Sequence, residues 1–167
     1  MNAPDVLKYG HLTVLGTVDC LAGPDWERPG ACGRWSVKEI VAHVASYELV
    51  LVDILTSQVD GGPTPLLDDF LAAPAEFNDR QVDQRSVQTA EMTLAEYRDA
   101  AERAMALAAR IPAEMWRQPG ILPWYGAEYD LDDLTTYMYY GHKREHTAQI
   151  ALFRDRVPYI PDRAVPT

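Results

Sequence analysis

The chain has 167 residues, of which 47% are hydrophobic and 24% are charged, and its formal net charge is −10. This length suits one domain with a substantial core, and the hydrophobic fraction excludes a disordered chain. The negative charge argues against nucleic acid as a partner, because nucleic-acid binding depends on Lys and Arg side chains that neutralise phosphates. We therefore expect a single helical domain over residues 1–167, with a short Pro-rich tail from about residue 157.

The amino terminus carries no basic segment followed by an apolar stretch, and no apolar run approaches 18 residues. We therefore expect a cytoplasmic protein that does not contact a membrane. Cys20 and Cys32 are expected to be free thiols, because disulfides are rare in that compartment. A homodimer is one assembly that we consider, since the sequence does not set the oligomeric state.

Residues 5–21 have a loose helical periodicity with apolar weight, and Gly23 and Pro24 end the pattern. We predict a first helix there. His11 lies in this segment among polar neighbours. We therefore expect it at the surface or at the rim of the core, with no part in a site.

A second helix is predicted over residues 36–58, because Ser36 and Glu39 have the spacing of a capping box. The apolar face of this helix also carries Glu48, and His43 lies on its flank, one turn from Tyr47. A single imidazole in such a place is more often structural than functional, and Glu48 is as well explained by a position at the rim. For both His43 and Glu48, the structural and the functional interpretation stay open.

The residues from 60 to 65 break the second helix, and the stretch through Pro74 is too interrupted for a long helix. A connection of about 15 residues can carry the chain back along a helical bundle, so we predict a crossover here. Helix is expected to resume near Ala75 and to include Phe77 and Asn78.

The strongest helical sequence runs to about Ile111. Thr93 and Glu96 have the spacing of a second capping box, which opens or reinforces this helix over residues 93–111. Residues 112–130 then form a second connection, rich in aromatic side chains such as Trp116, Trp124 and Tyr129. We expect this connection to cover the open end of a site near His142, because large rings in a loop need an apolar surface to pack against. A hydrophobic lid with no ligand beneath it is the alternative.

The last predicted helix covers residues 131–154, with Asp130 or Asp132 as its cap. It carries His142 and His146, and residues four apart on a helix point about 40° apart, which is a chelating geometry. With a constant helical period, one stripe contains the positions of Leu131, Leu134, Met138, Gly141, His142, Glu145, Gln149, Leu152 and Phe153, with His146 at its edge.

The predicted buried face of this helix is thus polar midway along its length. Burying such groups without partners costs a few kcal/mol each, so something must satisfy them. A metal ion would do so, and Glu145 and Gln149 would then orient the imidazoles by hydrogen bonds. The alternatives are a hydrogen-bonded polar layer, or a stripe that is rotated so that these groups face water.

Residues 142–146 also match the H-x-x-E-H motif of inverted zinc peptidases, in which Glu is the general base. Those enzymes are far larger and take a further ligand downstream, whereas only residues 147–167 follow here. We reject that reading. A third ligand would have to come from upstream, where His43 is the remaining histidine on a core-facing helix.

Three segments of the chain form a recognisable set: W-S-x-x-E-x-x-x-H at residues 35–43, a central Phe77-Asn78, and H-x-x-x-H-x-x-Q-I at residues 142–150. Together they resemble the DinB-like superfamily of bacterial four-helix metalloproteins. The resemblance covers nearly the whole chain and implies an all-α four-helix bundle with long crossover connections. It also implies a divalent metal, often nickel or zinc, held by His43, His142 and His146. The residues that we expect around the ligands or in the pocket are Tyr47, Asn78, Trp124 and Gln149.

By this resemblance, we expect a metal-dependent enzyme that transfers a small thiol to an electrophilic substrate, with the metal activating the thiolate. The superfamily includes thiol S-transferases that use bacterial low-molecular-weight thiols, a thiol-dependent isomerase and hydrolase-like proteins. The first alternative is therefore a hydrolase that uses a metal-bound hydroxide, with Glu48 or Glu145 as the base. The second is a non-catalytic protein of the stress response that binds a metal or a small ligand.

Overall fold

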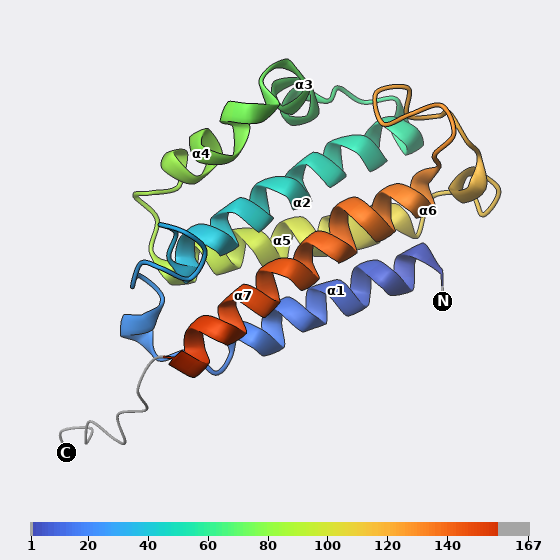
Figure 1. Ribbon diagram of the computed structural model, residues 1–167. Helices are drawn as coiled ribbons and strands as arrows, with labels where there is room; N and C mark the ends of the chain where they lie inside the picture. The colour runs from blue at the N-terminus through green and yellow to red at the C-terminus, as the bar shows by residue number, and fades with distance from the viewer. Residues whose placement is uncertain (1, 157–167) are drawn as a thin grey trace.

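The computed structural model describes residues 2–156, and its long helices lie side by side along one direction (Figure 1). The long elements are α1 (Ala3–Val18), α2 (Val37–Asp60), α5 (Ala90–Ala108) and the continuous stretch of α6 (Leu131–Leu134), η3 (Thr135–Gly141) and α7 (His142–Arg156). The shorter elements lie in the connections and are η1 (Gly23–Asp25), α3 (Pro65–Ala72), α4 (Pro74–Gln84) and η2 (Met115–Arg117). Among the described residues, β geometry is limited to one isolated bridge between Cys32 and Trp35. The predicted all-α fold is confirmed.

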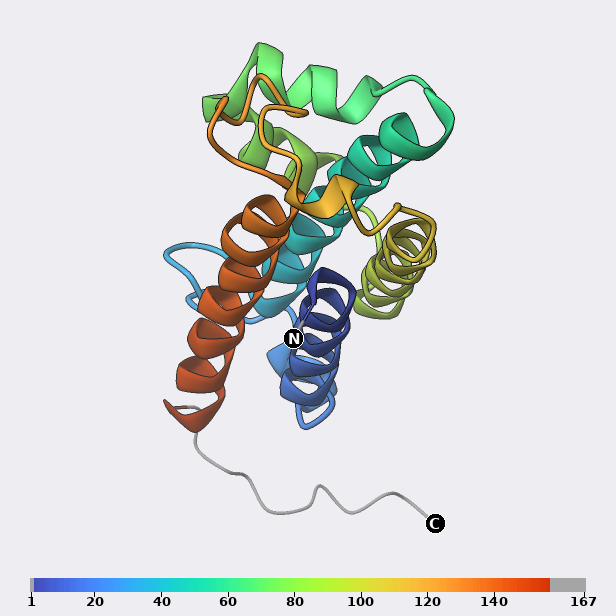
Figure 2. The ribbon, with the colours of Figure 1, turned by 90° about the vertical axis from the view of Figure 1, so that its right-hand side faces the viewer.

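The connections determine the direction of each helix. α1 ends and α2 begins at the same end of the bundle, whereas α3 and α4 return the chain so that α5 runs parallel to α2 (Figure 1). α5 packs most closely against α2, and α1 packs along η3 and α7, which Figure 2 shows from the side. The crossover predicted between the second helix and the strong helix of residues 93–111 is confirmed.

Local capping sets the starts of α1 and α2. Asn2 accepts the amide of Asp5 through Oδ1 at 3.0 Å. At α2, Ser36 Oγ accepts the amide of Glu39 at 3.3 Å, and Glu39 Oε2 accepts the amide of Ser36 at 2.7 Å. The predicted capping box is therefore present. α2 stops at Gly61, whose φ of 66° lies in the left-handed region that glycine adopts most easily.

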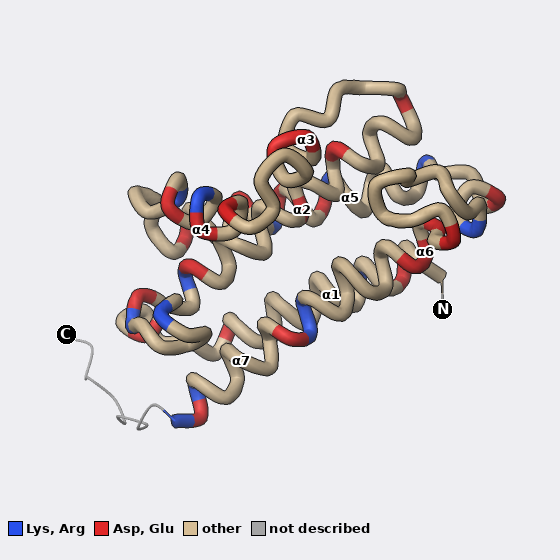
Figure 3. Tube along the Cα trace, turned by 45° about the horizontal axis from the view of Figure 1, so that its top comes forward, with Lys and Arg blue, Asp and Glu red and all other residues tan. Residues whose placement is uncertain are grey.

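Helix α3 was not predicted, because the sequence between the second helix and Pro74 appeared too interrupted. The structure shows why it forms. Asp53 of α2 accepts the amides of Leu66 and Leu67 through Oδ2, at 2.6 and 3.2 Å, and so supplies the cap that the local sequence lacks. An ion pair of 2.7 Å between Arg80 and Asp69 then ties α4 to α3, where acidic and basic positions lie close together (Figure 3).

The start of α5 differs from the prediction. Its cap is Thr89, which accepts the amide of Met92 at 3.2 Å, so Thr93 lies inside the first turn. The Thr93 hydroxyl instead donates to the carbonyl of Thr89 at 3.0 Å, and Glu96 accepts from Arg85 at 2.8 Å. The predicted capping box is wrong because both side chains have tertiary or neighbouring partners that compete with it.

The last helix begins at Asp130, one of the two predicted caps, and contains an unpredicted π-helical segment, η3. π-helical i→i+5 bonds widen each turn, so positions beyond η3 fall out of phase with a constant α-helical period. The predicted buried stripe is therefore wrong at Glu145 and Leu152, whereas Phe153 is buried as predicted. Glu145 is exposed and Leu152 is 57% exposed, whereas Lys143 and Thr147 are buried.

Two apolar clusters form the core, and a polar layer separates them. The buried polar residues of α2 at the boundary between the clusters are His43, Ser46 and Glu48. Around them, α2 contributes Val37, Ile40, Val41, Val44 and Ala45 to one cluster and Val50, Leu51, Val52, Ile54 and Leu55 to the other. On the facing helix, Lys143 and His146 lie between Tyr139 of one cluster and Ile150 of the other. Polar groups are thus enclosed midway along the bundle.

α2 is also long and apolar enough, by length and composition, to cross a membrane, with a mean hydropathy of 1.5 over its best window. Yet 72% of that window is buried inside the bundle, and the core helix of a soluble protein passes the same test. This feature is therefore weak support for a membrane span. Cys20 and Cys32 are both free, as predicted.

Candidate metal centre

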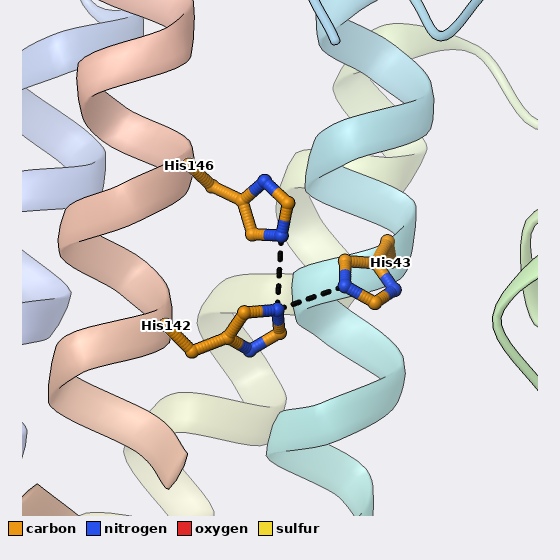
Figure 4. Close-up of side chains that lie close together, drawn as sticks. All are labelled: His43, His142 and His146. Atoms are coloured by element: carbon orange, nitrogen blue, oxygen red, sulfur yellow. Dashed lines mark hydrogen bonds between the residues drawn. The ribbon is translucent and has the colours of Figure 1, made fainter. Parts of the chain in front are cut away.

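Three histidines from two helices converge in the polar layer. His43 comes from the second turn of α2, and His142 and His146 come from the first two turns of α7 (Figure 4). The Nε2 atom of His142 lies 2.9 Å from Nε2 of His43 and 2.9 Å from Nε2 of His146. One ligand atom from each ring lies within 4.8 Å of the others, so the structure brings together the three residues that the resemblance marked as ligands.

The converging nitrogens cannot satisfy one another. A neutral imidazole nitrogen holds either one proton or one lone pair, so Nε2 of His142 cannot form a good hydrogen bond to both neighbours. In addition, Nδ1 of His43 is buried with no hydrogen-bond partner among the described residues. Buried polar groups are normally paired, so the converging Nε2 atoms lack a proton or a cation between them, and Nδ1 of His43 lacks a partner of its own in the described part of the chain.

The histidines are held in the form that binds metals. Burial lowers the pKa of His43 from 6.5 to about 2, and any charge on His142 or His146 would lower it further. Burial, followed by the neighbouring His146 and Lys143, lowers the pKa of His142 to about 3. Burial also lowers the pKa of His146, against the opposing effects of Gln149 and Glu145. All three rings are therefore neutral at pH 7, and neutral imidazole is a metal ligand.

The donor set fits a divalent ion such as zinc or nickel. Zinc–nitrogen distances are about 2.0–2.1 Å, so nitrogens around one tetrahedral ion lie about 3.3 Å apart, a few tenths of an ångström more than the two measured contacts. Three histidines leave a coordination position for water or substrate, as catalytic rather than structural zinc sites do.

Gln149 lies where the sequence predicted it, beside a ligand. Its Oε1 lies 2.8 Å from Nδ1 of His146 and can accept the proton of that nitrogen. This hydrogen bond leaves the lone pair of His146 on Nε2, which points toward the other two rings. The contact therefore sets the tautomer that a metal site needs.

Tyr47 and Asn78 also lie at the cluster. The Tyr47 ring centroid is 4.9 Å from that of His43 and 4.6 Å from that of His142. The Tyr47 hydroxyl donates to Oδ1 of Asn78 at 3.2 Å, which joins α2 to α4. Trp35 packs on His43 with centroids 5.1 Å apart. Trp35 was missed as a site residue, although it opens the motif that ends at His43.

The aromatic connection of residues 112–130 was predicted to cover the site, and the structure shows only that some of its rings pack on the apolar core. Trp124 packs against Tyr125, with centroids 5.7 Å apart, and both rings pack on the apolar cluster that includes Val50 and Tyr139. Tyr129 is 41% exposed. The expectation that Trp124 and its neighbours cover the histidines remains a prediction.

Glu48 and Glu145, the two candidate bases, have different environments. Glu48 is 1% exposed, and its Oε1 lies 2.7 Å from Nζ of Lys143, which is also 1% exposed. Glu145 is exposed, contrary to its predicted place in the buried stripe, because η3 shifts the phase of the helix. Sequence reasoning missed Lys143 for the same reason, since a constant period places it outside the buried face.

His11 also differs from the prediction. It is 7% exposed rather than at the surface, and its Nδ1 lies 3.3 Å from the hydroxyl of Tyr97 on α5. Burial, with smaller effects from nearby charges that include Lys143, lowers its pKa. His11 is thus a buried histidine with a partner on α5, outside the group of three candidate ligands.

Comparison with known proteins gives two matches. The family model described as mycothiol maleylpyruvate isomerase N-terminal domain matches residues 11–135, a range that contains His43 and ends before His142. The crystal structure of a histidine-to-alanine mutant of the mycothiol-dependent maleylpyruvate isomerase superposes with a TM-score of 0.71 at 11% sequence identity. The match covers 89% of this chain and 59% of that one, and at this identity it shows the fold alone. No protein with a curated description matches.

Proposed function

The chain belongs to the mycothiol maleylpyruvate isomerase N-terminal domain family, within the DinB-like superfamily of helical proteins, and on this basis we propose that it is a divalent-metal-dependent enzyme that uses a small thiol. Its substrate would be a small electrophile, and its ligands His43, His142 and His146. The chain spans 59% of the length of the solved isomerase, so the activity of that whole protein is carried over here as part of the proposal.

The convergence of three neutral imidazoles is the observation that supports this proposal best. Nε2 of His142 lies 2.9 Å from Nε2 of His43 and of His146 and cannot pair well with both, in a layer where burial keeps the rings uncharged. A hydrogen-bonded polar core would instead give each nitrogen its own partner. A divalent ion held there supplies Lewis-acid chemistry, which lowers the pKa of a thiol and polarises an electrophile.

The surrounding residues have positioning roles in this proposal. Gln149 keeps the Nε2 lone pair of His146 directed at the cluster. Tyr47 shields two of the rings on one side, and its hydrogen bond to Asn78 holds its hydroxyl toward α4. Trp35 packs on His43 and limits the access of water to that ring. The side chains of His142 and Tyr47 are partly exposed, so a substrate would approach the cluster from the surface that these two residues share.

The proposed reaction begins with loss of the thiol proton to solvent and attack of the sulfur on an electrophilic carbon. If that carbon belongs to an alkene conjugated to a carbonyl, the electrons of the double bond move to the carbonyl oxygen. Rotation about the new single bond and expulsion of the sulfur give an isomer and return the thiolate. Capture of a proton at carbon instead leaves the thiol attached, which is transfer. Isomerisation and transfer therefore share their first step.

Hydrolysis is less well supported, because neither candidate base is placed for it. The carboxylate of Glu48 is paired with Lys143, and Glu145 points away from the buried layer. A general base must lie within hydrogen-bond reach of the proton that it removes. We therefore give the thiol-dependent reaction priority over the hydrolase and over a purely metal-binding protein.

The test uses the full chain, stripped of metal with a chelator and then titrated with cobalt(II). We expect about one equivalent to bind, and the d–d absorption to report a site with nitrogen ligands and an open position. Mycothiol should then add a sulfur-to-cobalt charge-transfer band, whereas its S-methyl derivative should not. Turnover is followed as loss of an activated alkene such as maleylpyruvate, with and without the thiol. Absence of stoichiometric metal binding contradicts the metal site, and metal binding without any effect of thiols contradicts the thiol reaction.

A further inference from the structure

An ion pair inside the bundle links the two helices that carry the three histidines. Glu48 of α2 and Lys143 of α7 are each 1% exposed, and Oε1 of Glu48 lies 2.7 Å from Nζ of Lys143. Each residue is close in sequence to a candidate ligand. Lys143 directly follows His142, and Glu48 directly follows Tyr47, whose ring contacts His43 and His142.

Helix α1 leaves room for the lysine side chain. A Cβ atom at Gly10 would lie 3.1 Å from Cδ of Lys143 and 3.4 Å from Cδ2 of Tyr140. These distances are tight, so a side chain at position 10 would push on Lys143. The aliphatic part of Lys143 thus runs directly along the backbone of α1, and its ammonium group is directed to α2.

Stability alone does not account for this pair. Removing two charges from water costs several kcal/mol per ion, and well-packed apolar residues in place of a buried ion pair are often neutral or stabilising. What an ion pair adds is a fixed geometry between specific atoms, since an apolar side chain can slide or rotate against its neighbour at little cost. The best supported use of such groups is to set register and orientation.

The orientation of α7 is what the histidine cluster requires. Successive residues on a helix point about 100° apart, so a fixed direction for Lys143 also fixes the direction of His142 before it and His146 three residues after it. The helix preceding His142 is the π-helical η3, which is wider and less regular than an α-helix. The contact of Lys143 with Glu48, in the first turn of α7, can therefore set the rotation of α7 about its axis, which η3 alone does not set.

We propose that the Glu48–Lys143 ion pair is a positioning device that sets the rotation of α7 about its axis and thereby directs His142 and His146 at His43. Gly10 is the third part of this device, because it lets Lys143 reach α2. The ligand role of the histidines rests on the proposed function, whereas the control of their orientation is a property of the protein without metal.

The first test replaces both charges in the double variant Glu48→Leu/Lys143→Met. We expect a folded protein whose Tm is equal to or above that of the original chain, because no charge is left unpaired. Its zinc affinity should fall by roughly 10- to 100-fold, the range seen when residues that orient metal ligands are changed, and its cobalt(II) d–d spectrum should change shape. A stable variant with the original affinity and spectrum would overturn the proposal.

The second test avoids the core charges and compares two glycines on one helix. Gly10→Ala pushes on Lys143, whereas Gly16→Ala on the same α1 meets no atom within 4 Å. Both changes raise helix propensity, so neither is expected to unfold α1. Gly10→Ala should weaken zinc binding several-fold and Gly16→Ala should leave it unchanged. Equal binding by the two variants would overturn the proposal even if the double variant fails to fold.

A third measurement separates this inference from the proposed function. Without metal, the ring NMR signals of His142 and His146 should shift in Gly10→Ala and stay in place in Gly16→Ala. If the original chain binds no divalent ion, the proposed function fails, yet these signals still decide whether the pair orients the histidines. Ring signals that do not move in Gly10→Ala would reject the positioning role.

Discussion

Two polar clusters lie next to each other in the bundle, and they differ in whether opposite charges meet within them. Lys143 and Glu48 have opposite charges and pair at 2.7 Å. The three histidines present like nitrogens at 2.9 Å, and Nε2 of His142 faces two neighbours with at most one proton. The first cluster balances its charges within the protein, although Oε1 of Glu48 has no hydrogen bond to the described residues beyond this ion pair. In the second cluster, a cation would pair the converging Nε2 atoms. Like nitrogens that converge without an opposite charge between them are therefore the feature that points to cation binding.

The two clusters also differ in access. The ion pair is enclosed, with the backbone of α1 against the lysine stem at Gly10. The histidine cluster keeps partly exposed members, His142 and the neighbouring Tyr47 and Trp35. A site for a metal and a substrate needs an open side, and a positioning contact does not. Substitutions in either cluster can test this difference.

The largest expected effect is loss of the metal on removal of one ligand. His43→Ala should reduce zinc affinity by more than the roughly 100-fold that changes around ligands reach, because a first ligand is lost. His11→Ala removes a buried histidine that pairs with Tyr97, and it should retain the metal. Elemental analysis of the purified variants measures both. Full occupancy in His43→Ala would show that the three nitrogens do not form the site.

The next largest effect is expected when one charge of the Glu48–Lys143 ion pair is removed. Lys143→Met leaves Glu48 as a buried, unpaired carboxylate, and the free energy of unfolding of the protein without metal should fall by about 3–5 kcal/mol. Urea unfolding followed by circular dichroism measures this change. The double variant Glu48→Leu/Lys143→Met is the control and should recover most of the loss. Equal stability of the single variant and the original chain would mean that the pair is not buried in solution.

A smaller effect appears on acidification of the protein without metal. The pKa values of His43 and His142 are lowered from 6.5 to about 2 and about 3, so the unfolded chain binds their protons first. Their contribution to stability is complete above pH 6.5 and is lost as the pH falls below it, by about 1.4 kcal/mol per pH unit for each ring. Urea unfolding between pH 5.5 and 4.5 measures the slope where it is close to this limit. His43→Ala should reduce it by about 1.4 kcal/mol per pH unit, and an unchanged slope would contradict the burial of that ring.

The sequence predicted most of what short-range signals determine. The caps at Ser36 and Asp130 and the crossover before α5 follow from local patterns, and they are confirmed. Helix α3 could not be predicted in this way, because Asp53 caps it from another helix. Local sequence patterns do not reveal a cap that comes from a residue on another helix.

The same limit explains the site residues that were missed. The three histidines lie together as the motifs suggested, but η3 shifts the helical phase and exchanges the expected places of Glu145 and Lys143. A π-helical segment has no simple sequence signature, so a constant period placed the wrong residue in the core. The partner of Glu48 was therefore found only from the structure.

The smallest expected effect tests which neighbour of the histidines orients them. Gln149 accepts from His146 at 2.8 Å, whereas Glu145 is exposed and acts on that ring only through its charge. Gln149→Leu removes the hydrogen bond that fixes the tautomer, so zinc affinity should fall by roughly 10- to 100-fold. Glu145→Gln removes one exposed charge and should change affinity much less, since water and salt screen such charges. Calorimetric titration at low and at physiological salt distinguishes the two, because only the effect of Glu145→Gln should shrink with salt. A larger loss in Glu145→Gln than in Gln149→Leu would mean that α7 is rotated from the orientation described here, so that Glu145 rather than Gln149 faces His146.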